Sequence, residues 1–173
     1  MQTITLHAPS LNDYADLLAF EIDNRAFFEA RINARPASYY SEAGLIAAIE
    51  QAQKERSEDR AYQFLVRNLS QQLLARVNLT QVRRQHFHSA QLGYRVAQAA
   101  QGQGVAKQAV RQILAFAFDE LQLQRVEAVV MESNLASIAV LKANGFQQYG
   151  RTEASFELAG QWHNCLYFEA RKP

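Results

Sequence analysis

The chain has 173 residues, of which 49% are hydrophobic and 20% are charged, with a formal net charge of +1. This length predicts one domain, residues 1–173, and the near-neutral balance argues against nucleic acid or a membrane surface as the main partner. With one cysteine, no run of roughly 20 apolar residues and no signal-peptide pattern, we expect a cytoplasmic protein.

The first sixty residues are predicted to be mostly helical. Their apolar spacing indicates one strand and three helices, over residues 2–7, 11–22, 26–31 and 41–60. Pro9 ends the strand, and Ser10 or Asn12 can cap the first helix. Pro36 lies in the break before the third helix, which Ser41 opens.

The period of the apolar residues changes at Ala61. Alternation over 62–66 and 73–79 predicts two antiparallel strands joined by a tight turn. Residues 81–88 are polar and are expected to connect to a third strand over 90–96. Three strands are thus predicted to meander into a glycine-rich turn.

The second half alternates helices with strands. A helical stripe over 105–121 is followed by the β-branched run Val126–Val130, predicted to be a strand buried on both faces. A further helix ends near Asn144–Gly145, and residues 146–158 and 162–170 close the chain as a hairpin. The element order is that of an α/β (α+β) domain with a mixed, mostly antiparallel sheet and one parallel βαβ crossover.

The stretch Val96–Ala106 connects the third strand of the meander to the helix that follows. Gly102 and Gly104 leave room for close approach to backbone amides, which suits a phosphate group at a helix N-terminus. Lys107 stands where a dinucleotide-binding turn would have its third glycine, and the P-loop pattern is absent. A plain connection between strand and helix is the alternative.

Three separated motifs bear on this choice. Gln101, Gly104 and Ala106 form a Gln-x-x-Gly-x-Ala pattern that resembles the acetyl-CoA signature of the GNAT acetyltransferases. Asn134-x-x-Ser137 and the run Leu141–Phe146 are similar to the second cofactor element of that family. The resemblance implies the GNAT fold and acetyl-CoA as co-substrate, with no metal.

The chain after Phe146 is similar to the branch that acetylates the alanine or serine N-termini of ribosomal proteins. The residues that carry this likeness are Gly145, Phe146, Gly150, Gly160, Gln161, Trp162 and Leu166. The likeness is good from Leu92 onward, whereas the first sixty residues agree only in element order.

The resemblance also implies the cofactor contacts. Backbone amides are expected to meet the pyrophosphate at Gly102, Gln103, Gly104, Val105, Ala106 and Lys107, beside Gln101. The strand before the turn splays from its neighbour in the family, so Tyr94, Arg95 and Val96 are expected to pair with the pantetheine arm. Asn134, Ser137 and Lys142 complete the expected cofactor-binding set, and Asn134 can also cap its helix.

The implied chemistry moves an acetyl group from a thioester to a neutral amine, and the leaving thiolate takes a proton. Relatives indicate Ser137 as the acid, the alternative being a serine on the helix surface. The tyrosine used elsewhere in the family is missing, since Leu141 and Asn144 stand in its place. Glu157 is the candidate base, although an ungapped count places Phe156 there. Water is the alternative, because an α-amine has a reference pKa of about 8.

Several other reactive side chains have simpler interpretations. His86 and His88 lack further ligands nearby, so no metal site is expected in the loop from Arg83 to His88, which is predicted to be solvated rather than to touch an acceptor. Cys165 lies in an apolar strand and is expected in the core. Trp162 either forms a wall of the acceptor pocket or has only a packing role in the fold.

The predicted function is acetylation of a primary amine, with a protein N-terminal α-amine of the ribosomal-protein type as the expected acceptor. A small-molecule amine such as a polyamine, an amino acid or a drug is one alternative. A CoA-binding module that has lost catalysis is the other. The sequence does not choose between a monomer and a homodimer.

Overall fold

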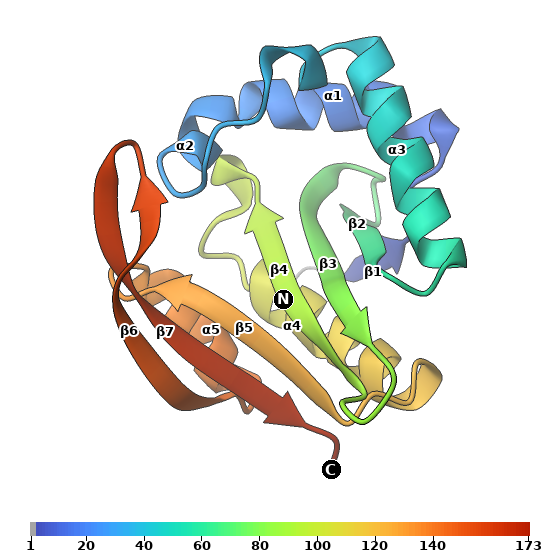
Figure 1. Ribbon diagram of the computed structural model, residues 1–173. Helices are drawn as coiled ribbons and strands as arrows, with labels where there is room; N and C mark the ends of the chain where they lie inside the picture. Colours follow the sequence, from blue (N-terminus) through green and yellow to red (C-terminus); the bar gives the residue numbers. More distant parts are fainter. Residues whose placement is uncertain (1–2) are drawn as a thin grey trace.

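The computed structural model describes residues 3–173, so Gln2 of the first predicted strand lies outside the described residues. Seven strands form one sheet in the order β1-β2-β3-β4-β5-β7-β6 (Figure 1). They are β1 Ile4–His7, β2 Tyr62–Asn68, β3 Leu73–Arg83, β4 Ser89–Val96, β5 Arg125–Met131, β6 Gln147–Leu158 and β7 Gln161–Arg171. Only β4 and β5 are parallel, which confirms the predicted mixed sheet and its single crossover.

Five α-helices flank this sheet in two groups (Figure 1). They are α1 Tyr14–Asp23, α2 Arg25–Glu29, α3 Glu42–Ser57, α4 Val105–Ala115 and α5 Leu135–Ala143. The first three gather at one side, whereas α4 and α5 lie behind the strands in the view of Figure 1. None of the helices between residues 3 and 173 is long and apolar enough to span a membrane.

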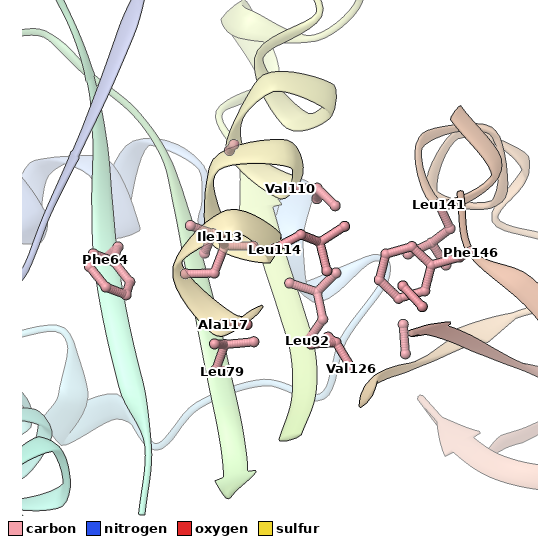
Figure 2. Packing of buried hydrophobic residues seen from close by; sticks show 14 of the residues in the cluster. Phe64, Leu79, Leu92, Val110, Ile113, Leu114, Ala117, Val126, Leu141 and Phe146 are labelled. Atoms are coloured by element: carbon pink, nitrogen blue, oxygen red, sulfur yellow. The ribbon is translucent and has the colours of Figure 1, made fainter. Parts of the chain in front are cut away.

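The main core fills the space between the sheet and α4. Helix α4 presents Val110, Ile113 and Leu114 to the strands, as its apolar stripe predicts (Figure 2). Phe64, Leu79, Leu92 and Val126 meet them from four strands, and Leu141 and Phe146 extend the same core under α5. This packing fixes the start of α4 against the end of β4.

A second, smaller core lies on the opposite face of the sheet. Leu65 turns away from its neighbours Phe64 and Val66, because successive side chains on a strand alternate between faces. It packs with apolar residues of the three N-terminal helices, namely Leu17, Phe20, Phe28, Leu45 and Ile49. This cluster holds the helices of the first group over β2 and β3.

Three of the predicted elements differ in detail. Strand β3 extends into the first residues of the predicted polar connection, because Arg83 still pairs with Ser89 beyond an irregularity. Strand β5 is buried on one face only: Val126, Ala128 and Val130 face the core, whereas Val129 is 40% exposed because the helices do not cover that side. The long helix ends in a π-helical turn, Phe116–Glu120, rather than as regular α-helix.

Candidate functional site

The two edges of β4 are occupied differently. Toward β3, β4 is paired from Ser89 to Val96. Toward β5, the pairing covers three residues, Ser89 to Gln91, while β5 remains paired with β7 along its whole length. The parallel strands therefore diverge after Gln91, and the β5-facing backbone edge of Leu92–Val96 has no strand partner. This is the splay expected at Tyr94, Arg95 and Val96.

The glycine turn follows directly at the open end of β4. Gly102 and Gly104 have φ values of 71° and 76°, a left-handed conformation that glycine adopts without strain. A Cβ on Gly102 would meet nothing within 4 Å, so this side of the turn is accessible. The Gln101 side chain donates to the carbonyl of Val96 over 2.9 Å and holds the turn against the strand.

Helix α4 starts immediately after this turn, with Gly104 as its N-cap. The amides of Val105, Ala106 and Lys107 open the helix, where they have no acceptor within it. The first turn holds no acidic residue. Unpaired amides, the positive end of the helix dipole and an accessible glycine turn together make an anion site.

A cavity of about 190 Å³ lies beside this anion site. Seven of the sequence-predicted residues line it, namely Tyr94, Arg95, Val96, Gln101, Ala106, Asn134 and Ser137. The other walls are Ala136 and Val140 of α5 and four residues in or just after α2, Phe27, Phe28, Arg31 and Ile32. The structure therefore brings the strand end, the glycine turn and the start of α5 together.

A second cavity of about 440 Å³ adjoins the first. It lies where β4 and β5 diverge, with Gln91 and Gly93 on one side and Val129 and Met131 on the other. Phe156 and Cys165 come from the C-terminal hairpin. Both cavities share Arg31, Ile32, Tyr94, Asn134 and Ser137, so these five residues form the junction between them.

Helix α5 places Ser137 at this junction. The Asn134 side chain accepts a hydrogen bond from the Ser137 amide over 3.1 Å, so Asn134 caps α5 as predicted while also lining both cavities. The Tyr94 hydroxyl donates to the Ser137 carbonyl over 3.3 Å, and burial raises the pKa of Tyr94. These contacts fix the first turn of α5 against β4.

Arg95 extends from the other face of β4 into a buried ionic cluster. Arg76 and Arg95 stand directly opposite each other in the β3–β4 register. Glu21 of α1, 1% exposed, ion-pairs with both guanidinium groups. Burial opposes ionisation of Glu21, but Arg76 and Arg95 outweigh it and lower the carboxyl pKa. Because like charges across a strand pair repel, Glu21 is needed to hold them together.

Other predicted site residues lie away from the cavities. Lys107 and Lys142 are exposed and line neither cavity. Glu157 is exposed and pairs in register with Trp162 near the tip of the β6–β7 hairpin, whereas its neighbour Phe156 reaches the second cavity. Trp162 is 62% exposed and lines a separate depression with Glu132 and Asn164, so the structure brings neither side chain to the junction.

The loop before β4 lies at the opposite end of that strand from the site. Seven residue steps separate Ser89 from Val96, roughly 23 Å at a strand's rise per residue. Arg84 ion-pairs with Asp59 and donates to the Leu121 carbonyl, which ties the loop to its own end of the molecule. No cluster of three or more His, Cys, Asp or Glu side chains within residues 3–173 is placed to hold a metal.

Sequence reasoning did not find the α2 side of the site. The sequence predicts Phe27, Phe28 and Arg31 only as part of a short helix and makes no prediction for Ile32, because their role depends on α2 packing across β4. The adjacent aromatic pair with an arginine four residues after Phe27 was the available signal. Cys165 is buried as predicted, and it also borders the second cavity.

Comparison with known proteins decides what kind of site this is. The model of the acetyltransferase (GNAT) domain family matches residues 3–147. This chain belongs to the GNAT acetyltransferase family. A Bacillus subtilis protein named "Probable N-acetyltransferase YjcK" is 32% identical over 164 residues, which are 94% of this chain and 91% of that protein.

Solved GNAT structures share the fold at lower sequence identity. The ribosomal-protein-S5-alanine acetyltransferase of Vibrio fischeri is 20% identical, with a TM-score of 0.94 over 99% of this chain and 94% of that one. The spermidine N-acetyltransferase of Vibrio cholerae, solved with CoA and spermine, is also 20% identical, with a TM-score of 0.82 over 98% and 95% of the two chains. These structures confirm the predicted fold.

The protein is therefore an acetyl-CoA-dependent N-acetyltransferase. Its residues suit the cofactor: an anion site at the glycine turn fits a pyrophosphate, and the unpaired edge of β4 fits an amide-bearing arm. The GNAT neighbours include enzymes for ribosomal proteins and for polyamines, so the family alone leaves the acceptor open.

Proposed function

We propose that this GNAT enzyme acetylates the α-amine at a protein N-terminus. The second cavity carries the proposal, because it meets the first at Ser137 and continues onto the bare face of the sheet. Val129, which lines this cavity, is 40% exposed, so the cavity opens to solvent where an extended chain can enter. Similarity to the S5-alanine enzyme supports the same acceptor class.

In the proposed arrangement, acetyl-CoA lies along the open edge of β4, with its pyrophosphate at the amides of residues 102–107. Tyr94, Arg95 and Val96 carry the arm and Gln101 holds the turn, while Asn134 and Ser137 meet the thioester end. Lys107 and Lys142 add positive charge outside the cavities. The acceptor amine enters from the second cavity and reaches the thioester at the junction.

The chemical step is direct. The neutral amine nitrogen attacks the thioester carbonyl, forming a C–N bond, and the C–S bond then breaks. The Ser137 hydroxyl donates its proton to the departing thiolate and recovers one from solvent. The amine loses its excess proton as the amide forms.

Water is the proposed acceptor of that proton. Within residues 3–173, neither Asp nor Glu lines either cavity, and Glu157 lies near the hairpin tip. An α-amine has a reference pKa of about 8, so a useful fraction is neutral at physiological pH without a dedicated base. Glu157 remains a candidate base only if the hairpin moves when the acceptor binds.

The test is thiol release from acetyl-CoA with peptides that begin with alanine or serine and contain one internal lysine. The same peptides with a blocked N-terminus are the control. We expect release with the free peptides and less than a tenth of that rate with the blocked ones, with mass spectrometry placing the acetyl group on the α-amine. Turnover of spermidine but not of any peptide would contradict the proposal.

A further inference from the structure

The junction between the two cavities has an unbalanced charge. Arg31 lies at the junction itself, and Arg95 lines the first cavity beside it. Neither Asp nor Glu lines the two cavities in the described chain. An amine entering this site therefore meets the guanidinium groups of Arg31 and Arg95, and Glu21, the carboxylate that pairs with Arg95, lines neither cavity.

The nearest buried carboxylate is already used. Glu21 ion-pairs with both Arg76 and Arg95, so one negative charge faces two positive charges. Burial, together with the positive charges of Arg76 and Arg35, lowers the pKa of Arg95 to about 10 although Glu21 raises it. At that value Arg95 stays protonated at neutral pH, and the cluster keeps a net positive charge toward the cavity.

Arg31 is held in place without a carboxylate partner. Its Nη1 donates to the Phe27 carbonyl over 2.9 Å, and its guanidinium lies 4.1 Å from the centre of the Phe27 ring. No Asp or Glu oxygen of residues 3–173 lies within ion-pair distance of it, whereas Arg25 on the preceding helix α2 pairs with Glu29. A guanidinium has five N–H donors, so Arg31 retains donors for a bidentate contact with an anion.

We propose that Arg31 selects N-termini in which an acidic side chain follows the reacting amine. The carboxylate would bind the free donors of Arg31, with Arg95 strengthening the field, while the amine reaches Ser137. A lysine at the same place, or the second ammonium of a polyamine, would meet like charge with no counter-charge nearby. This inference rests on the proposed function and names the acceptor that the site prefers.

The experiment compares three peptides that start with alanine and differ only at the second residue, as Asp, Asn or Lys. We expect kcat/KM to fall in the order Asp, Asn, Lys, with at least a tenfold ratio between Asp and Lys that shrinks in 0.5 M NaCl. In Arg31→Glu the order should reverse. Arg25→Glu, an exposed change on the preceding helix α2 and outside both cavities, should keep the wild-type order.

Each possible result supports or contradicts the selectivity that we propose for Arg31. Equal kcat/KM for the three peptides, or an unchanged order in Arg31→Glu, would overturn the inference while leaving N-terminal acetylation intact. If Arg31→Glu raises KM for acetyl-CoA equally with all three peptides and keeps their order, Arg31 serves the cofactor and the inference is wrong. If wild-type protein acetylates spermidine and none of the peptides, the proposed function and the inference both fail.

Discussion

Strand β4 is paired along one edge and largely unpaired along the other, where we propose that acetyl-CoA binds. On the β3 edge, Gln91 to Val96 run in continuous register, and Glu21 ion-pairs with both of the facing arginines. On the β5 edge, pairing stops after three residues, and both cavities begin where it stops. The same backbone thus gives stability through pairing and gives function by leaving pairing incomplete.

Substitutions on the paired edge and on the open edge of β4 should therefore have different effects. Changes on the paired edge should lower the free energy of unfolding and affect catalysis only through folding. Changes on the open edge should weaken acetyl-CoA binding or turnover while the protein stays folded, because that edge has few partners in the fold to lose.

The largest expected effect is on the paired edge. Glu21→Gln leaves Arg76 and Arg95 facing each other in a buried site, and we expect it to lower the free energy of unfolding by about 3–5 kcal/mol. Urea denaturation followed by circular dichroism measures this. Glu50→Gln, an exposed change on α3, should cost less than about 0.5 kcal/mol. Similar losses in the two variants would show that the buried cluster does not hold the edge.

The next effect is at the glycine turn. Gly104→Glu places a carboxylate and a strained φ where the pyrophosphate is expected, so we predict CoA binding weaker by at least about 100-fold, or about 2.8 kcal/mol. Isothermal titration calorimetry with CoA measures this change in affinity. Gly160→Glu, at another positive-φ glycine outside the cavities, should leave CoA affinity within about twofold and controls for backbone strain. Equal losses in both would place the pyrophosphate elsewhere.

A smaller effect is expected at the junction. Ser137→Ala removes the proposed proton donor, and we predict a fall in kcat of at least tenfold with little change in CoA affinity. Steady-state kinetics with saturating acetyl-CoA separates the two. Ser133→Ala, which alters an exposed serine just before Asn134, should behave as wild type. A loss of CoA affinity as large as the loss of kcat would make Ser137 a binding residue only.

The smallest effect concerns Asn134. Asn134→Ala removes the cap of α5 and should lower the free energy of unfolding by about 1 kcal/mol. Asn134→Asp keeps a capping oxygen, so its stability should stay near wild type, but its negative charge at the junction should still weaken acetyl-CoA binding by a few-fold. If both variants lose stability equally, the side-chain oxygen is not what caps the helix.

The sequence predicts the cofactor side of the site better than it predicts the acceptor side. The anion turn was predictable because Gln101, Gly104 and Ala106 are close in the chain and glycine has a clear conformational reason there. The strand order of the hairpins and the βαβ crossover also follow from local periodicity. Periodicity did not predict that one face of β5 is bare, since exposure depends on which helices lie above it.

The acceptor side depends on tertiary packing. Arg31 reaches the junction only because α2 packs across the end of β4, and the spacing of Phe27 and Arg31 does not by itself predict that packing. The ungapped count places Phe156 at the position of the base, and the β6–β7 hairpin indeed brings Phe156 rather than Glu157 to the second cavity. Glu21 lies at helical spacing from Leu17 and Leu18 on the inward face of α1, but its ion-pair partners are two arginines more than fifty positions away, which no local pattern predicts.

Amide NMR with CoA tests the central claim most directly. Backbone amide shifts measured with and without CoA report which peptide groups the cofactor touches. We predict the largest changes at residues 102–107 and along Leu92–Val96, with little change in β1, β2 and the Ala159–Gly160 turn. Largest changes around Glu132 and Trp162, with the glycine turn unaffected, would contradict the claim that the open edge of β4 holds acetyl-CoA.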